Sequence, residues 1–264
     1  MFNGIFNHEA RLFTDNYELS GINSLEFSYK SSSDVKNILG SRRGFSVNSG
    51  PIQQGLTLNR NLIYNDPVLN YTGSEPIAAS LFYNDSYYGF EKGYLNNYSL
   101  SCAVGAVPKS ASNFIITDEM KSGVDAGRKR TVRRHPKIDI PSQGSIAITC
   151  DNSTTNRVVG FNYAININRK PIYGIGQKDP FAVETIAPIF YTANASIDVD
   201  DAFLQNSYNF LELKENKNLS IIVNGRDGKE LQSVNIPNAS LINETLRISQ
   251  DGSLKLDLNY VGHG

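Results

Sequence analysis

The chain has 264 residues, a length that suits one large β domain or two domains of ordinary size, either with a buried core. Hydrophobic residues make up 40% of the chain and charged residues 19%, which excludes an intrinsically disordered protein. The formal net charge is −1, and residues 1–120 and 138–264 are each mildly acidic, which excludes a protein that grips nucleic acid over a broad surface.

The first half of the chain predicts strands joined by turns, with one short helix. The N-terminus lacks a basic start followed by a long apolar run, and no stretch approaches the length of a membrane span. We therefore expect no signal peptide and no membrane segment, and a chain made and kept in a cytoplasm. Residues 25–30 alternate apolar and polar side chains, which indicates a strand with one apolar face. Ser74 as a cap and Pro76 near the first turn predict a helix over residues 74–83.

The second half gives similar signals. Residues 161–168 again alternate apolar and polar side chains, which predicts a second two-faced strand. Asp200 is a suitable cap for a helix over residues 200–217. Residues 218–236 and 246–261 each predict a hairpin around an Asp-Gly turn.

The chain has two cysteines, Cys102 and Cys150, and each lies in a strand-like run. Neither belongs to a Cys-x-x-Cys pair. We interpret them as two buried thiols, with a disulfide as the open alternative.

A strongly basic segment separates the two halves. Residues 121–137 carry seven basic side chains and one acidic one, and six of the basic ones fall within GRKRTVRRHPK (127–137). No aromatic residues are interleaved there for base stacking. We therefore favour a hydrated connection that lies on acidic neighbouring subunits over a nucleic-acid arm.

Three blocks of sequence recur in the same order in the two halves. They are LEFSYKSSSDVKNILG (25–40) beside FNYAININRKPIYGIG (161–176) at an offset of 136, GPIQQGLTLNRNL (50–62) beside APIFYTANASIDV (187–199) at 137, and NNYSLS (96–101) beside PNASLI (237–242) at 141. We interpret the blocks as a duplicated β domain. The predicted division is a first domain at 1–120, a basic linker at 121–137 and a second domain at 138–264.

The sequence contains few motifs that are typical of a catalytic, metal-binding or cofactor-binding site. None of the three histidines lies in a run that looks like core, and no His or Cys spacing is typical of zinc or of a Ser-His-Asp site. GIGQKD (174–179) lacks the third glycine of a dinucleotide loop, and GSRRG (40–44) is no phosphate loop. DVDD (198–201) lacks the Gly and the distal Glu of a calcium loop, so we interpret it as a strand end that caps the next helix. We predict no enzymatic activity, no metal and no cofactor.

The duplicated pattern resembles a known family. NRNLIYNDPVLNYTG (59–73), CDNSTTNRVVGFNY (150–163) and NASLINETLRISQDGSLKLDLNYVG (238–262) are similar to the tail-tube proteins of long-tailed bacteriophages. More narrowly, they resemble the subset whose tube domain is duplicated within one chain. The resemblance covers nearly the whole sequence.

The resemblance implies a mainly β fold of two tandem β-sandwich domains, each with one short flanking helix. It implies that strands join between subunits into a ring whose inner wall is a continuous β-barrel, and that three chains form a homotrimer with pseudo-sixfold symmetry. Rings stack into a tube in the virion tail, beside other tail proteins, and the genome passes through without specific binding. A polar or mildly acidic wall suits this passage, because a wall lined with Lys and Arg would bind phosphates.

On this interpretation the polar faces of the alternating strands line the lumen. The candidate lumen-facing residues are Glu26, Thr57, Asn59, Asn162, Asn166, Asp198 and Asp200. Their apolar alternates, which should pack inside the domains, are Phe27, Leu58, Tyr163, Ile165, Ile197 and Val199. The basic linker residues expected outside the lumen, in contact with neighbouring subunits, are Arg128, Lys129, Arg130, Arg133, Arg134 and Lys137.

Two other classes stay open from the sequence alone. A different structural part of the virion, such as a distal-tail, hub or neck protein, could use the same fold. A carbohydrate-binding β-sandwich module would share the Tyr, Asn and Asp content, although Trp is absent and the two halves lack matched aromatic clusters at loop tips.

Overall fold

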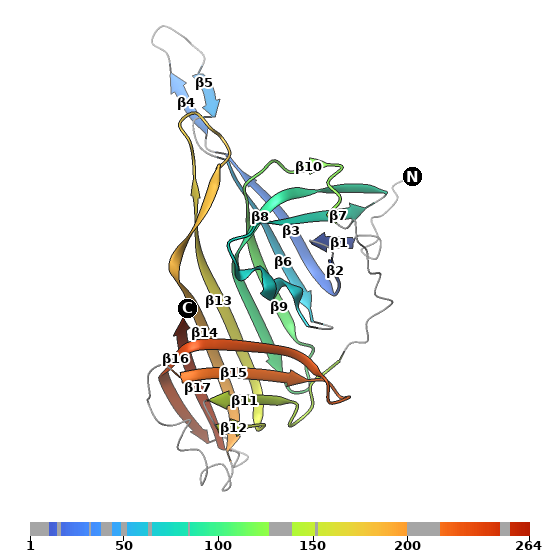
Figure 1. Cartoon of the computed structure of the whole chain (residues 1–264), viewed down its shortest axis with the longest axis vertical. Coiled ribbons are helices and arrows are strands. Elements are labelled where there is room, and N and C mark those ends of the chain that lie inside the picture. The colour runs from blue at the N-terminus through green and yellow to red at the C-terminus, as the bar shows by residue number, and fades with distance from the viewer. Residues whose placement is uncertain are drawn as a thin grey trace.

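Strands make up most of the protein, and nearly all of them pair into one large antiparallel sheet that is not closed over the described residues (Figure 1). The computed structural model describes residues 11–14, 17–31, 33–37, 44–48, 52–62, 65–83, 85–126, 139–150, 153–199, 217–248 and 254–264, with the backbone alone at 33–37 and 44–48. The predicted mainly β fold is confirmed.

The elements of the first part of the chain are β1 (Arg11–Thr14), β2 (Tyr17–Leu19), β3 (Ile22–Lys30), β4 (Ser33–Asn37), β5 (Gly44–Asn48), β6 (Gln53–Asn61), the 3-10 helix η2 (Pro67–Thr72), β7 (Ile77–Tyr83), β8 (Ser86–Ala103), β9 (Lys109–Ile116) and β10 (Lys121–Ser122). Those of the second part are β11 (Ile146–Cys150), β12 (Ser153–Thr155), β13 (Val158–Ile172), β14 (Ala182–Val199), β15 (Lys217–Asn224), β16 (Glu230–Ile248) and β17 (Leu254–His263).

The same order of strands occurs twice in the sheet. Neighbouring strands run β2-β1-β7-β8-β9-β6-β3 in the first part of the chain. They run β12-β11-β15-β16-β17-β14-β13 in the second part. β8 pairs with β13, which joins the two series into one sheet. β3 and β13, which contain the similar alternating residues 25–30 and 161–167, hold corresponding places.

Register shifts mark the same points in the two series. The β3–β6 pair shifts between Ile22 and Ser24, and the β13–β14 pair shifts between Val158 and Gly160, 136 residues later. A bulge adds an unpaired residue at a defined place, so matching bulges align two strands residue by residue. The alignment has the same offset as the first pair of sequence blocks.

A second pair of register shifts gives a different offset between the two series from the one expected from the third pair of sequence blocks. The β8–β9 pair shifts between Leu95 and Asn97, and the β16–β17 pair shifts between Leu241 and Asn243. The offset between β8 and β16 is therefore 146, and the offset of 141 expected for this region is wrong. Short polar segments such as NNYSLS and PNASLI can be aligned by chance, because they share few large side chains.

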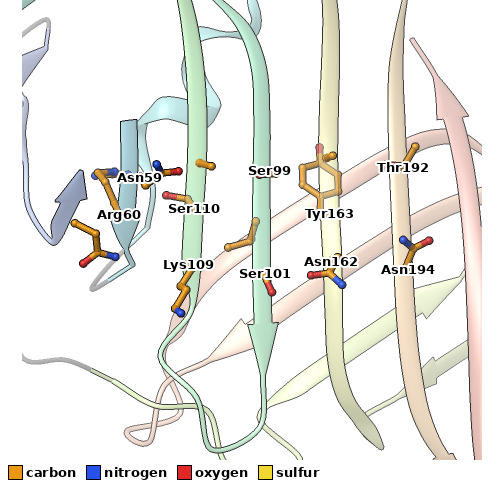
Figure 2. Close-up of a pocket in the computed structure, with 14 residues that line it drawn as sticks. Asn59, Arg60, Ser99, Ser101, Lys109, Ser110, Asn162, Tyr163, Thr192 and Asn194 are labelled. Atoms are coloured by element: carbon orange, nitrogen blue, oxygen red, sulfur yellow. The ribbon is translucent and has the colours of Figure 1, made fainter. Parts of the chain in front are cut away.

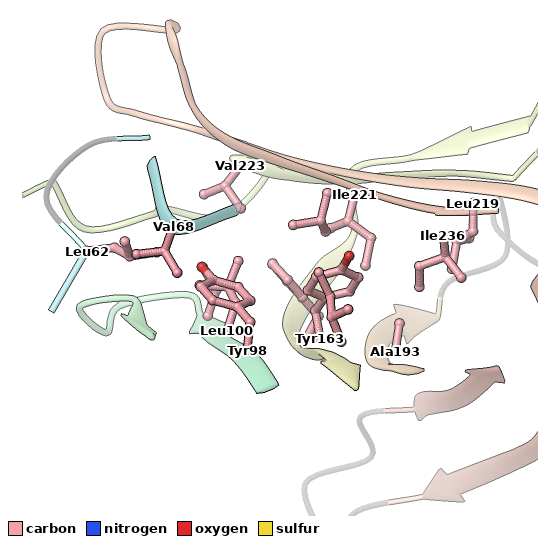
Figure 3. Close-up of a cluster of buried hydrophobic side chains, with 14 of the residues drawn as sticks. Leu62, Val68, Tyr98, Leu100, Tyr163, Ala193, Leu219, Ile221, Val223 and Ile236 are labelled. Atoms are coloured by element: carbon pink, nitrogen blue, oxygen red, sulfur yellow. The ribbon is translucent and has the colours of Figure 1, made fainter. Parts of the chain in front are cut away.

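The apolar side chains of both series form one continuous core. The first parts of β8 and β16 pair with β7 and β15, whereas their second parts pair with β9 and β17. β15 and the first part of β16 therefore cross over the apolar side of β8, β13 and β14. There Val223 and Ile221 lie over Leu100 and Tyr163, and Ile236 lies nearer to β14 (Figure 3). All five are at most 3% exposed, and burial of each stabilises the fold by roughly 1.5–3 kcal/mol.

The helix predicted over residues 74–83 is wrong. Residues Ile77–Tyr83 form β7, which pairs with β1 on one side and β8 on the other. Ile77 and Ala79 are buried in the core. Strand pairing on both sides outweighs the weak helical preference of this short segment.

The helix of the described first part of the chain is instead η2. The Asp66 side chain accepts a hydrogen bond from Val68 N, and Pro67 occupies the first turn, as is typical of a helix start. The helix predicted over 200–217 lies outside the described residues, except that Lys217 begins β15.

Both predicted hairpins are confirmed as strand pairs. β15 and β16 pair up to Asn224 and Glu230, and the turn between them places Gly228 at a φ of 76°, a conformation that favours glycine. β16 and β17 pair up to Ile248 and Leu254, and the turn between them lies outside the described residues.

The two cysteines are buried and are not joined in a disulfide, as predicted. Burial raises the pKa of the Cys102 thiol to about 12, so almost none of the reactive thiolate is present near neutral pH. We expect neither Cys102 nor Cys150 to react with iodoacetamide at pH 8 in the native protein, and both to react in urea. Mass spectrometry of the alkylated protein measures this, and rapid labelling without urea would contradict the packing around β8 and β11.

Candidate functional site

One side of the sheet is polar across eight neighbouring strands. In the order β3-β6-β9-β8-β13-β14-β17-β16, each strand pairs with the next. Buried and exposed side chains alternate along β6, β9 and β13. Successive side chains of a strand point to opposite faces, so the buried set forms the core and the other set covers the opposite side. We call this opposite side of the eight strands the polar face.

The structure brings six of the seven predicted lumen-facing residues onto the polar face. The exposed ones are Glu26, Thr57, Asn162 and Asn166, and the partly exposed ones are Asn59 and Asp198. The seventh, Asp200, lies outside the described residues. That this face lines a lumen stays a prediction.

The apolar alternates lie on the other side of the same strands. Leu58, Tyr163, Ile165 and Ile197 are buried in the core, and Phe27 and Val199 are partly buried against it. The strand faces therefore have the predicted orientation.

The polar face carries a row of amides that sequence reasoning missed. Asn162 lies opposite Asn194, Asn194 opposite Asn259, and Asn259 opposite Asn243. These four residues come from four neighbouring strands. Each asparagine occupies a polar position in its own strand, but the row exists only because these strands pair in this register.

The polar face is hollowed. A hollow of about 480 Å³ lies over the middle strands and is lined by Asn59, Ser101, Asn162 and Asn194, among others (Figure 2). A second hollow of about 430 Å³ extends the surface over β14, β17 and β16. Asparagine, serine and threonine are the commonest residues in the lining of both hollows, beside Lys109 in the first and Arg247 and Asp257 in the second. The amide and hydroxyl groups bind water and carry no net charge.

The charged side chains of the polar face include an ion pair near its β16 edge. Arg247 Nε lies 2.8 Å from Asp257 Oδ2, and Ser196 Oγ donates to Asp257 Oδ1 at 2.5 Å. Lys109 lies opposite Ser101 near the middle of the face and is exposed. The result is a concave surface whose described side chains are mostly neutral and polar.

A buried polar cluster joins the two series beneath the polar face. Arg60 donates to Asp66, and the side chains are 3% and 0% exposed. Tyr98 Oη donates to Asp66 Oδ2 at 3.1 Å, and the Asp66 backbone N donates to Gln232 Oε1 at 2.7 Å. Burial and the negative charge of Asp66 raise the pKa of Tyr98 well above its ordinary value, so the phenol stays a neutral donor. Because Gln232 belongs to β16, the cluster ties the second series to the first.

The eight-strand run ends at two strand edges that pair on one side only among the described residues. These edges are β3, which pairs with β6, and the second part of β16, which pairs with β17. On β16, Ile242, Leu246 and Ile248 are 65%, 54% and 77% exposed, and on β3 Tyr29 is 62% exposed. Exposed apolar side chains on an edge strand are typical of a surface that another chain covers.

The remaining predicted site falls outside the described residues. It comprises the basic linker residues Arg128, Lys129, Arg130, Arg133, Arg134 and Lys137. Across the described ranges, no group of three or more His, Cys, Asp or Glu side chains is placed to hold a metal ion. No helix in the same ranges is long and apolar enough to cross a membrane.

No protein-family model matches the chain, and no curated protein matches it. Function is therefore inferred from the polar face and its two edges.

Proposed function

We propose that the protein is the tail-tube subunit of a long-tailed bacteriophage, a structural virion protein without enzymatic activity. The observation that carries the proposal is the open eight-strand run, which has a concave polar face, a buried apolar face and two edges with exposed apolar side chains. Within one copy no described strand covers these edges, whereas copies joined edge to edge in a closed ring leave no edge open.

The repeated strand order supports a duplicated chain. We propose two tandem sandwich-like domains, 1–120 and 138–264, joined by the basic linker, so that each copy supplies two equivalent units. Three copies then form a ring with pseudo-sixfold symmetry. Joining β3 of one copy to β16 of the next is a head-to-tail contact, and such contacts close into rings when the rotation between copies allows it.

The polar face suits the wall of a channel for DNA. Amides and hydroxyls predominate on it, and among its cations Arg247 and Lys255 lie beside the carboxylates of Asp257 and Asp198. The wall therefore presents mixed charges rather than an array of cations that would hold phosphates, so the genome can pass without specific binding. The concave shape of this side also agrees with a wall that curves around a lumen.

The β13–β14 pair supports stacking of rings. It continues to Ile172 and Ala182, beyond the ends of its pairing with β8 and β17. Ile175 and Phe181 near its tip are highly exposed. We propose that these side chains contact an adjacent ring.

One observation keeps a carbohydrate-binding module as the second candidate. A cavity of about 610 Å³ is lined by the aromatic residues Phe27, Tyr29 and Tyr88 and by Glu119 and Asp179. Aromatic rings beside carboxylates suit sugar recognition. In a ring, the β3 side of this cavity would lie at the contact between copies.

Electron microscopy of the purified protein tests the proposed function. Stacked rings or tubes support it, and discrete assemblies of another shape indicate a different virion part. Monomers at all concentrations that bind glycans indicate the carbohydrate module.

Replacing Asn162 and Asn194 with lysine should convert the assembled protein into a DNA binder, because each ring would gain cations that face the lumen. We expect a short DNA duplex to bind the assembled protein at low salt, and the slope of log K against log salt concentration to become more negative by roughly 0.9 per neutralised phosphate. Fluorescence anisotropy across a salt series measures this.

The matched control is the double variant Ser220→Lys and Asn235→Lys, which places the same added charge on an opposite pair of β15 and the crossing part of β16. Equal DNA binding by the control would show that the polar face has no special access to DNA.

A further inference from the structure

We propose that β3 of one copy adds to the β16 edge of a second copy in the register that β13 takes on β8 within the chain. This inference rests on the proposed function, since it requires that copies assemble. It specifies the contacting residues, which come from the repeated strand order of this structure.

The internal junction provides the template for the contact. In the two series β3 corresponds to β13 at an offset of 136, and β16 corresponds to β8 at an offset of 146. β13 occupies the edge of the second part of β8. The corresponding edge of β16 has no strand on it among the described residues, and a second copy's β3 is the strand that corresponds to β13.

The template gives the register directly. Within the chain, Phe161 lies opposite Cys102, Asn162 opposite Ser101, and Tyr163 opposite Leu100. The corresponding pairs between copies are Leu25 with Ile248, Glu26 with Arg247, and Phe27 with Leu246.

The exposed apolar side chains of the edges agree with this register. At the internal junction Leu100, Cys102 and Tyr163 are at most 3% exposed. Their counterparts at the free edges are Leu246, which is 54% exposed, Ile248, which is 77% exposed, and Phe27, which is partly exposed. The same positions are thus covered where a neighbouring strand is present and open where it is missing. At the internal junction the crossing strands β15 and β16 also cover these positions. A second copy would bring, with its β3, the corresponding strand β7 and first part of β8, whose Tyr88 already contacts Phe27.

The register also brings opposite charges together on the polar face. Glu26 and Arg247 have no charged counterparts at the internal junction, where Asn162 faces Ser101. The side chain of Arg247 is 69% exposed and uses Nε for Asp257, so its terminal nitrogens can bind a second carboxylate. Directly opposite charges stabilise an antiparallel pair, and like charges destabilise it. The charged pair exists only between copies, so it favours the joining of β3 to β16 over other pairings of the edges.

The test is a charge exchange at this pair, read out by sedimentation velocity over a range of protein concentrations. Glu26→Arg and Arg247→Glu should each raise the concentration needed for assembly by roughly tenfold, because each places like charges opposite one another. The double variant should assemble near the wild-type concentration. Circular dichroism of unassembled samples should match among all variants, because both side chains are exposed within one copy.

A mixture of the two single variants gives a second readout. Each restored contact joins one copy of each variant, so a ring of three cannot satisfy all its contacts. We expect the mixture to form open chains and the double variant to form closed rings.

A control exchange reverses the exposed pair of Asp227 and Lys229 in the β15–β16 turn and should leave assembly unchanged. If the wild type assembles and the single variants assemble equally well, the proposed register is wrong while the proposed function stands. If the single variants fail and the double variant is no better, the two residues do not face each other. If the wild type never assembles, both proposals fail.

Discussion

Replacing Asp66 with asparagine should lower the free energy of unfolding by about 3–5 kcal/mol, because it leaves the buried charge of Arg60 without its partner. The variant also weakens the bonds that hold Tyr98 and the start of η2. Urea unfolding of the unassembled protein, followed by circular dichroism, measures the change.

An exposed ion pair provides the control. Asp227 Oδ2 lies 3.6 Å from Lys229 Nζ, and the two side chains are 59% and 85% exposed. Asp227→Asn should therefore change the free energy of unfolding by less than about 1 kcal/mol. Equal effects of the two substitutions would show that the Arg60–Asp66 pair is not buried.

Replacing Leu100 with alanine should lower the free energy of unfolding by about 2–5 kcal/mol, because the side chain is 1% exposed and its loss leaves a cavity between β8 and the crossing strand β15. Leu246→Ala is the matched variant, since Leu246 is the counterpart of Leu100 on the free edge and is 54% exposed. In an unassembled copy it should cost less than about 1 kcal/mol.

Leu246→Ala should affect assembly even though it has little effect on the stability of one copy. The Leu246 variant should fold normally but assemble only at a higher protein concentration, because its side chain is buried between copies. Sedimentation velocity measures the assembly and urea unfolding the stability of the same samples. A Leu246 variant that assembles like the wild type would contradict the burial of this edge.

The faces of the strands could be predicted because the signal is local. Alternation over residues 161–168 indicates which side chains point to the core, and the structure buries Tyr163 and Ile165 accordingly. The offset of 136 between the first blocks was also informative, since the bulges of β3 and β13 have the same separation.

The row of amides and the two edges could not be predicted, because they depend on which distant strands pair. Asn162 and Asn259 are separated by almost a hundred residues, and only the β13-β14-β17 order brings them into one row. The helix expected at 74–83 failed for the same reason, since pairing with β1 and β8 decides the conformation of Ile77–Tyr83.

The buried Arg60–Asp66 pair could have been predicted from the sequence pattern of β6. Along β6 the core positions are Leu56 and Leu58, and Arg60 occupies the next position in this alternation. A basic residue at a core position of a strand needs a buried partner. The partner Asp66 follows six residues later, immediately before the proline that starts η2.

Electron cryomicroscopy of the assembled protein tests the central claim most directly. We expect a ring of three copies in which the eight-strand runs join through β3 and β16 into one closed barrel, with Asn162, Asn194, Asn243 and Asn259 facing the lumen. An assembly in which these asparagines lie on the outer surface, or in which β3 and β16 remain uncovered, would contradict the account.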